Sequence, residues 1–273
     1  TDYKITWCPG CPNHRILDAT KIAISSLMEQ GYKQQDFAMT TGIGCHGKLF
    51  DYLNISGFYS LHGRTIPTAL GIKLGNPNLH IIAFAGDGDT YSEGIAHFMH
   101  SGRLNADITL LVHDNQSFSL TTGQATPTSQ TGYKSKAEPL GKVGPPLNPI
   151  KLALSSGITF IARTNARDPA HTAEIIEKAI KHKGFSFVEI IQDCIVFNLD
   201  INNKDKKTYK LQEPAKTMDE AFKLADEWDY NLNDGKIALG VLWQDQSRKP
   251  LEEEWPQLSL LKKKGASWKK LKR

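Results

Sequence analysis

Cysteine is scarce in this chain and long apolar runs are missing, and each absence excludes a class of protein. Four of the 273 residues are cysteine, too few for the disulfide framework of a small secreted domain. No stretch of about 18 consecutive apolar residues occurs, so no membrane-spanning helix is expected. A charged-then-apolar leader and internal repeats are also missing. We therefore predict a cytoplasmic globular protein.

The charge of the chain is unevenly distributed. The formal net charge is +4, but the last twelve residues (262–273) hold seven basic and no acidic side chains, which leaves the remaining 261 residues at −3. A basic tail of this kind is usually solvated, and it can also dock on an acidic partner. The mildly acidic body leads us to expect neither nucleic acid nor a membrane as a partner.

The apolar pattern predicts an α/β protein with a doubly wound, mostly parallel sheet. Short runs that are hydrophobic without clean alternation are typical of buried parallel strands. Helical periodicity appears between them within 14–31, 92–105 and 168–184, while the Pro/Gly-rich stretch 138–149 is expected to be a loop. We predict a binding domain over 1–200 and a C-terminal extension over 201–273. The predicted strands lie near 36–42, 79–86, 107–114, 158–162, 185–192 and 236–243.

Polar motifs and cysteines follow four of these predicted strands. Cys45 comes after the first, "GDGD" (86–89) after the second, "DNQS" (114–117) after the third and Cys194 after the fifth. Ligands of open α/β sheets collect outside the carboxyl ends of the strands. We therefore expect these four segments to meet at one edge of the sheet.

The segment "AFAGDGDTYSEG" has the composition of a strand, a tight glycine turn and a helix start. Gly86 and Gly88 allow close backbone approach, and the helix N-terminus favours an anion. Asp87 and, on the end of the next strand, Asn115 offer oxygen ligands suited to Mg²⁺. A GDG followed by Asn at this distance resembles the thiamine-diphosphate signature, which implies that Asp87, Asn115 and the Ser117 carbonyl hold the Mg²⁺ of that cofactor.

The stretch "WCPGCP" (7–12) leaves several readings open on its own. A redox dithiol needs no further cysteine, and a zinc knuckle usually takes its ligands from closely spaced pairs. Cysteines elsewhere in the chain can also be small buried hydrophobes. Four thiolates suit an iron–sulfur cubane.

A family resemblance covers residues 7 to about 197. The motifs "WCPGCP", "GIGCHGK", "LHGR", "GDGD", "DNQSFSLTTGQATPT" and "QDC" occur in this order. Together they resemble the β subunit of 2-oxoacid:ferredoxin oxidoreductases. The resemblance implies oxidative decarboxylation of a 2-oxoacid (2-oxoglutarate, pyruvate or a broad range), transfer of the acyl group to coenzyme A and of electrons to ferredoxin. It also implies a [4Fe–4S] cluster on Cys8, Cys11, Cys45 and Cys194.

The same resemblance assigns residues to the cofactor site. It places His62 beside the cofactor, where we expect a catalytic role. From its position three residues beyond Cys45, the cation of Lys48 is expected to hold the carboxylate of the 2-oxoacid. The residues expected to bind thiamine diphosphate are Ile43, Gly44, Cys45, His46, His62, Gly86, Gly88, Asp89, Ser119 and Leu120.

One part of a complete thiamine enzyme is not recognisable in the sequence. In such enzymes a second domain supplies the glutamate that activates the cofactor. We therefore expect an α subunit to supply it, in an assembly of paired αβ units. Two other hypotheses remain open at this stage: a non-redox thiamine enzyme subunit with incidental cysteines, and a structural zinc-binding module.

Overall fold

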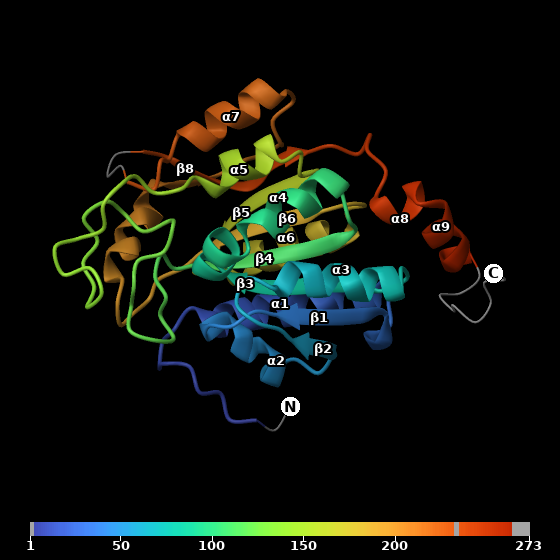
Figure 1. Cartoon of the computed structure of the whole chain (residues 1–273), viewed down its shortest axis with the longest axis horizontal. Helices are drawn as coiled ribbons and strands as arrows, with labels where there is room; N and C mark the ends of the chain where they lie inside the picture. The colour runs from blue at the N-terminus through green and yellow to red at the C-terminus, as the bar shows by residue number, and fades with distance from the viewer. Residues whose placement is uncertain (1–2, 232–234, 264–273) are drawn as a thin grey trace.

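The computed structural model describes residues 3–231 and 235–263, which form helices on both faces of one eight-stranded sheet (Figure 1). The neighbouring strands are parallel except β8, which runs antiparallel to β5. All six predicted strands are present, and the predicted α/β class is confirmed. In spatial order the strands are β2 (Ser56–Tyr59), β1 (Phe37–Thr41), β3 (His80–Gly86), β4 (Ile108–Asp114), β6 (Ser186–Ile191), β5 (Phe160–Asn165), β8 (Ile237–Gln244) and β7 (Thr208–Lys210).

Helices cover both faces of the sheet, which is why its central strands are buried throughout. Helices α1 and α6 pack together on one face, and α3, α4, α5 and α7 lie on the other. The helices are α1 (Asn13–Glu29), α2 (Leu49–Tyr52), α3 (Thr65–Gly75), α4 (Ile95–Leu104), α5 (Pro149–Ser155), α6 (Pro169–Lys181), α7 (Met218–Asp226), α8 (Leu251–Glu254) and α9 (Pro256–Lys263).

Strand β3 illustrates how one apolar run supplies two cores. Ile82 and Phe84 join the cluster under α1 and α6, whereas Ile81, Ala83 and Ala85 join the cluster on the opposite face. Successive side chains of a strand point to opposite faces, so a strand covered on both sides is apolar at every position. This accounts for the hydrophobic segments of the sequence in which apolar and polar residues do not alternate.

Helix α1 ends, and helix α6 begins, at the capping residues that the sequence indicates. Helix α1 is followed by Gly31 at φ 102°, and the amide of Tyr32 donates to the carbonyl of Leu27, as in a glycine-terminated helix. At the start of α6, the Asp168 side chain accepts from the amide of His171, and Pro169 takes the first helical position. Both features place a helix boundary where the sequence predicts one.

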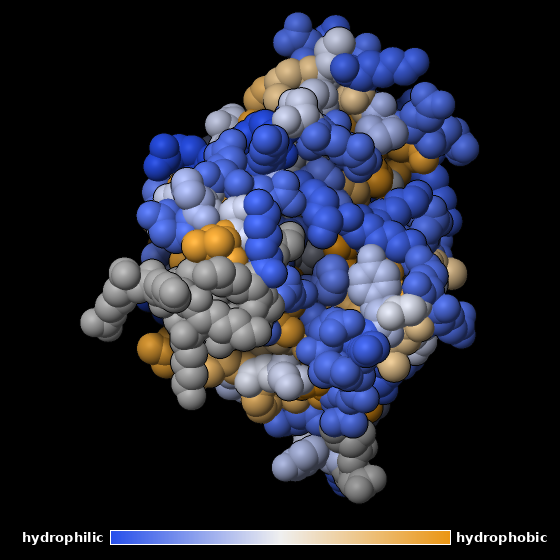
Figure 2. All heavy atoms as spheres, turned by 90° about the vertical axis from the view of Figure 1, so that its right-hand side faces the viewer, coloured by the Kyte–Doolittle hydropathy of each residue, from blue (hydrophilic) through white to orange (hydrophobic). Residues whose placement is uncertain are grey.

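A long irregular loop joins β4 to α5 and includes the predicted loop 138–149, whose last residue begins α5. Figure 1 shows this loop on the left, beyond one end of the sheet. The face that carries α8 and α9 is mostly hydrophilic, with apolar side chains in small separate groups (Figure 2). Most of the predicted basic tail, residues 264–273, lies outside the described residues. Among the helices that are described, none has the length and apolarity needed to cross a membrane.

The buried His182 makes a pH-dependent contribution to stability. Its Nε2 lies 2.8 Å from Thr159 Oγ1, and burial lowers its pKa to about 4. The folded state therefore resists protonation that the unfolded state accepts below pH 6.5. We expect the free energy of unfolding to fall between about pH 6.5 and 4, with His182 contributing on the order of 3 kcal/mol to this loss.

Urea unfolding of His182→Gln at several pH values tests this expectation. The variant should lose less stability than the wild type over that range, because glutamine does not titrate. Exposed His100→Gln is the matched control and should follow the wild type. Identical slopes for His182→Gln and the wild type would contradict the expectation.

Candidate active site

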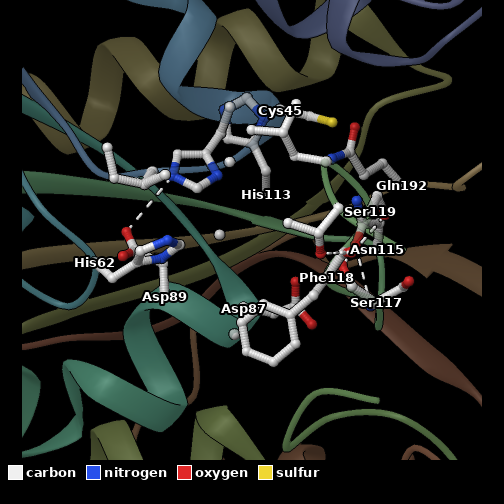
Figure 3. A pocket seen from close by; sticks show the side chains of 17 residues that line it. Cys45, His62, Asp87, Asp89, His113, Asn115, Ser117, Phe118, Ser119 and Gln192 are labelled. Carbon is white, nitrogen blue, oxygen red and sulfur yellow. Dashed lines mark hydrogen bonds and ion pairs between the residues drawn. The ribbon is translucent and has the colours of Figure 1, made fainter. Parts of the chain in front are cut away.

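Four loops meet at one edge of the sheet because they leave four adjacent parallel strands, β1, β3, β4 and β6, at their carboxyl ends. Together with the turn after β2, which carries His62, they enclose a cavity, here named the strand-end pocket (Figure 3). Every residue expected to bind thiamine diphosphate lines it, as do the three expected Mg²⁺ ligands. Its lining residues are Ile43, Gly44, Cys45, His46, His62, Gly86, Asp87, Gly88, Asp89, His113, Asn115, Ser117, Phe118, Ser119, Leu120, Thr121 and Gln192.

A second cavity, here named the cysteine cavity, adjoins the first. Its volume is about 140 Å³, and all four cysteines of the chain line it. It shares Cys45, Asn115, Ser119 and Leu120 with the strand-end pocket. Residues 8, 11, 45 and 194, far apart in the sequence, are therefore brought around one space beside the predicted cofactor site. Its lining residues are Thr6, Trp7, Cys8, Cys11, Asn13, Cys45, Lys48, Asn115, Ser119, Leu120, Asp193, Cys194, Ile195 and Val196.

The N-terminal segment is held in place by Trp7. Its indole Nε1 donates to the carbonyl of Cys45 at 2.7 Å, and its buried ring meets Tyr52 edge-on at 4.9 Å between centroids. The amide of Cys11 donates to the carbonyl of Cys8, which closes the turn between the two cysteines. A large aromatic side chain next to Cys8 therefore fixes the two N-terminal thiols against the loop that carries Cys45.

Asp87 is a fully buried carboxyl group. Burial raises its pKa to about 6, while a 3.0 Å hydrogen bond from Thr128 Oγ1 to its Oδ2 favours the ionised form. The same hydroxyl lies 3.0 Å from Asp114 Oδ1, and burial raises the pKa of Asp114 well above its usual range. The single proton of the Thr128 hydroxyl can be donated to only one of these two carboxyl groups at a time. Burial therefore disfavours the ionised form of both carboxyl groups, and a bound cation would stabilise the ionised form of Asp87.

His46 and Asp89 form a buried pair at the base of the strand-end pocket. His46 Nε2 lies 3.5 Å from Asp89 Oδ2, and Asp89 Oδ1 accepts from the amide of Gly63 at 2.6 Å. The second contact ties the turn that carries His62 to the start of η3 (Asp89–Glu93), a short π-helix of the kind often found at functional sites. The pair therefore joins two of the pocket's loops.

The glycines of this site make room for protein rings as well as for a ligand. A Cβ atom at Gly86 would lie 2.9 Å from His46 Nδ1, and one at Gly88 would lie 2.3 Å from Phe118. Neither glycine has a positive φ angle. Glycine is therefore needed at both positions because the rings of His46 and Phe118 approach the backbone closely. The motif alone did not reveal this role of the two glycines.

The four thiols are free, and burial makes two of them, Cys11 and Cys45, reluctant to ionise without a cationic partner. Burial raises the pKa of Cys11, and it raises the pKa of Cys45 to about 11. Within 3–231 and 235–263, no three or more His, Cys, Asp or Glu side chains gather closely enough to hold one metal ion. The four cysteines line one cavity.

Lys48 lies in the cysteine cavity and is not among the lining residues of the strand-end pocket. Its Nζ donates to the Oγ1 of Thr6 at 3.1 Å. His113, Phe118 and Gln192 line the strand-end pocket but were not expected as site residues, although Phe118 and Gln192 lie within the quoted motifs. The sequence offered one signal for His113, because it is a polar residue inside the fully buried strand β4.

Comparison with known proteins first defines the class. Residues 42–190 match the family described as thiamine pyrophosphate enzyme, C-terminal TPP binding domain. The matched region begins directly after β1 and contains β3 and β4, so it includes the loops that form most of the strand-end pocket. The chain therefore carries a thiamine-diphosphate-binding domain.

More similar relatives define the family. The chain is 42% identical to a 2-oxoacid:ferredoxin oxidoreductase subunit beta from Saccharolobus solfataricus, with 88% of this chain and 79% of the relative covered. It is 32% identical to a 2-oxoglutarate synthase subunit KorB from Methanocaldococcus jannaschii, with 90% of each covered. The chain belongs to the family of 2-oxoacid:ferredoxin oxidoreductase β subunits.

A solved structure agrees with this assignment. It is a 2-oxoglutarate:ferredoxin oxidoreductase from Magnetococcus marinus with 2-oxoglutarate, coenzyme A and succinyl-CoA bound. The TM-score is 0.87 at 29% identity, with 98% of this chain and 90% of that chain covered. The sequence-based prediction of family and fold is thus confirmed.

Proposed function

We propose that this chain, with an α subunit, oxidatively decarboxylates a 2-oxoacid and passes the electrons through a [4Fe–4S] cluster to ferredoxin. The bond between C1 and C2 of the oxoacid breaks with loss of CO₂, and the acyl group joins the thiol of coenzyme A. The observation that carries the proposal is the cysteine cavity, which shares four lining residues with the strand-end pocket. Because the cavities share these residues, their occupants would be neighbours.

The donor set of the strand-end pocket fits thiamine diphosphate and Mg²⁺. Asp87, Asn115 and the Ser117 carbonyl would hold the ion, since hard oxygen donors are what Mg²⁺ prefers. The buried carboxylate of Asp87 gains from a cation at that position. When bound, thiamine diphosphate supplies the electron sink that decarboxylation requires. His62, in the loop that Asp89 anchors, would contact it from the side of α3.

The cysteine cavity fits a cluster better than one ion. Each cysteine thiolate that holds a [4Fe–4S] cluster binds a different iron atom. The four cysteine sulfurs would therefore lie around the cluster, separated from one another by about its width. That all four cysteines line one cavity supports this arrangement. Binding to iron would also ionise Cys11 and Cys45, whose pKa values burial raises.

The first experiment measures iron, acid-labile sulfide and zinc in the enzyme purified anaerobically with its α subunit. We expect about four iron and four sulfide atoms per chain, with a visible spectrum that bleaches on addition of oxoacid and coenzyme A. Stoichiometric zinc would support a structural zinc module instead. Thiamine diphosphate without iron would support a non-redox thiamine enzyme.

The α subunit would complete the site and form paired αβ units with this chain. The relatives are named as β subunits, which supports a partner. Their names and the solved structure support 2-oxoglutarate among the substrates. Residues 201–273 form the proposed C-terminal extension, in which β7 and β8 extend the sheet and α8 and α9 offer a surface for subunit contacts.

Lys48 is proposed to bind the carboxylate of the 2-oxoacid. Lys48→Ala is expected to raise the KM for the oxoacid roughly tenfold, because a hydrogen bond to a charged group is lost. Steady-state kinetics with saturating coenzyme A measures the change. Lys48→Arg keeps the positive charge and should restore most of the affinity. An unchanged KM together with a lower reduction potential of the cluster would assign Lys48 to the cysteines that it faces.

A further inference from the structure

A buried hydrogen bond joins the two cavities. Asn13 and His113 are 1% and 2% exposed, and Asn13 Oδ1 lies 2.8 Å from His113 Nδ1. Asn13 is the first residue of α1, two residues after Cys11, whereas His113 is the penultimate residue of β4. The contact therefore links the segment that carries the N-terminal cysteines to the strand that leads into Asn115.

Each member of this pair also has one polar atom without a partner. Asn13 Nδ2 and His113 Nε2 are buried and form no hydrogen bond with the described residues. Asn13 lines the cysteine cavity, and His113 lines the strand-end pocket. Leaving a buried donor or acceptor unpaired is costly, so the two atoms call for partners that the chain itself does not supply.

The chemistry of the pair determines what those partners are. An amide oxygen only accepts hydrogen bonds, so the Nδ1 of His113 carries the proton that Asn13 Oδ1 receives. In the neutral ring Nε2 then keeps its lone pair and is an acceptor. On the other side, Asn13 Nδ2 is a donor. A sulfur in the cysteine cavity and a polar hydrogen in the strand-end pocket match these two atoms.

We propose that Asn13 and His113 form a bridge between the two cofactors, in which Asn13 Nδ2 donates to a sulfur of the cluster and His113 Nε2 accepts from bound thiamine diphosphate. This inference rests on the proposed function. Both residues are positioning residues of the electron path: the bridge fixes the distance and orientation of one cofactor relative to the other. It involves no bond making or breaking.

The bridge has a measurable effect at each end. Hydrogen bonds to cluster sulfurs raise the reduction potential, since they stabilise the more negative reduced state. Replacing Asn13 by leucine should therefore lower the potential of the cluster. Replacing His113 by leucine should weaken thiamine diphosphate binding by about 3- to 10-fold, the effect of one hydrogen bond.

The experiment uses the complete enzyme, purified anaerobically with its partner subunit. Redox titration followed by EPR gives the cluster potential of the wild type and Asn13→Leu, and calorimetric titration with thiamine diphosphate and Mg²⁺ gives the dissociation constants of the His113 variants. His113→Gln places an oxygen acceptor near the position of Nε2 and should bind within about twofold of the wild type. His113→Asn can still bond to Asn13 but lacks that acceptor, and should bind as weakly as His113→Leu.

A measurement on the unaltered protein guards against variants that fail to fold. Pulsed EPR of the reduced wild-type cluster with ¹⁵N-labelled asparagine should detect a coupled side-chain nitrogen. A missing coupling, an unshifted potential in Asn13→Leu that keeps its iron, or equal affinities of His113→Gln and His113→Asn would overturn the bridge. Wild-type enzyme without iron would instead overturn the proposed function.

Discussion

Asp87→Ala is expected to abolish retention of thiamine diphosphate while leaving the iron content of the chain unchanged. Asp87 shares the Thr128 hydroxyl with Asp114, and it lines the strand-end pocket but not the cysteine cavity. Replacing residues that merely orient a metal ligand costs about 10- to 100-fold in affinity. Loss of a ligand itself should weaken cofactor binding on the order of a hundredfold or more.

Equilibrium dialysis with thiamine diphosphate and Mg²⁺, beside iron analysis of the same preparation, measures both effects of Asp87→Ala. Asp87→Asn keeps one oxygen ligand and should bind the cofactor with intermediate affinity. Exposed Asp18→Ala, on α1, is the control for a lost carboxylate and should behave as the wild type. Loss of iron together with the cofactor would mean that the two cavities are structurally one site.

The sequence was informative where function is encoded in short segments at the ends of buried strands. Cys45, Asp87, Asn115 and Cys194 each follow an apolar run, and parallel strands must end at one edge. Their meeting was therefore predictable once the strands were recognised, although Asp87 and Cys194 are 107 residues apart in numbering. The strand order, which places β1, β3, β4 and β6 side by side, then brings all four loops together.

Other features depend on tertiary contacts that no local pattern records. Strand β2 is short, exposed and lies at the sheet edge, so its residues lack the buried apolar signature. Lys48 is three residues from Cys45, but the 3₁₀ turn between them directs it toward Thr6 and the cysteine cavity. Asn13 and His113 are 100 residues apart, and neither belongs to a motif with a known spacing. Asn13 and His113 come into contact only because helix α1 packs on the sheet.

Cys194→Ser is expected to have the opposite effects from Asp87→Ala: the chain should lose iron and still bind thiamine diphosphate. The serine hydroxyl is a poor ligand for iron compared with a thiolate. Iron per chain should fall from about four to below about one, and ferredoxin reduction should fall to the order of 1% or less of the wild-type rate. Thiamine diphosphate binding should remain, because Cys194 lines the cysteine cavity and not the strand-end pocket.

Cys45 provides the comparison that makes the Cys194 result interpretable. Cys45 lines both cavities and accepts the Trp7 hydrogen bond through its carbonyl, so Cys45→Ser should reduce both iron content and cofactor affinity. Metal analysis and dialysis of the two variants in parallel measure this difference. If Cys194→Ser kept four iron atoms, the fourth ligand would lie elsewhere, and the buried Cys194 thiol would serve only to accept the Phe197 amide that bonds to it at 3.3 Å. Loss of iron alone would instead mean that electrons leave through the cysteine cavity, while the chemistry on the 2-oxoacid stays in the strand-end pocket.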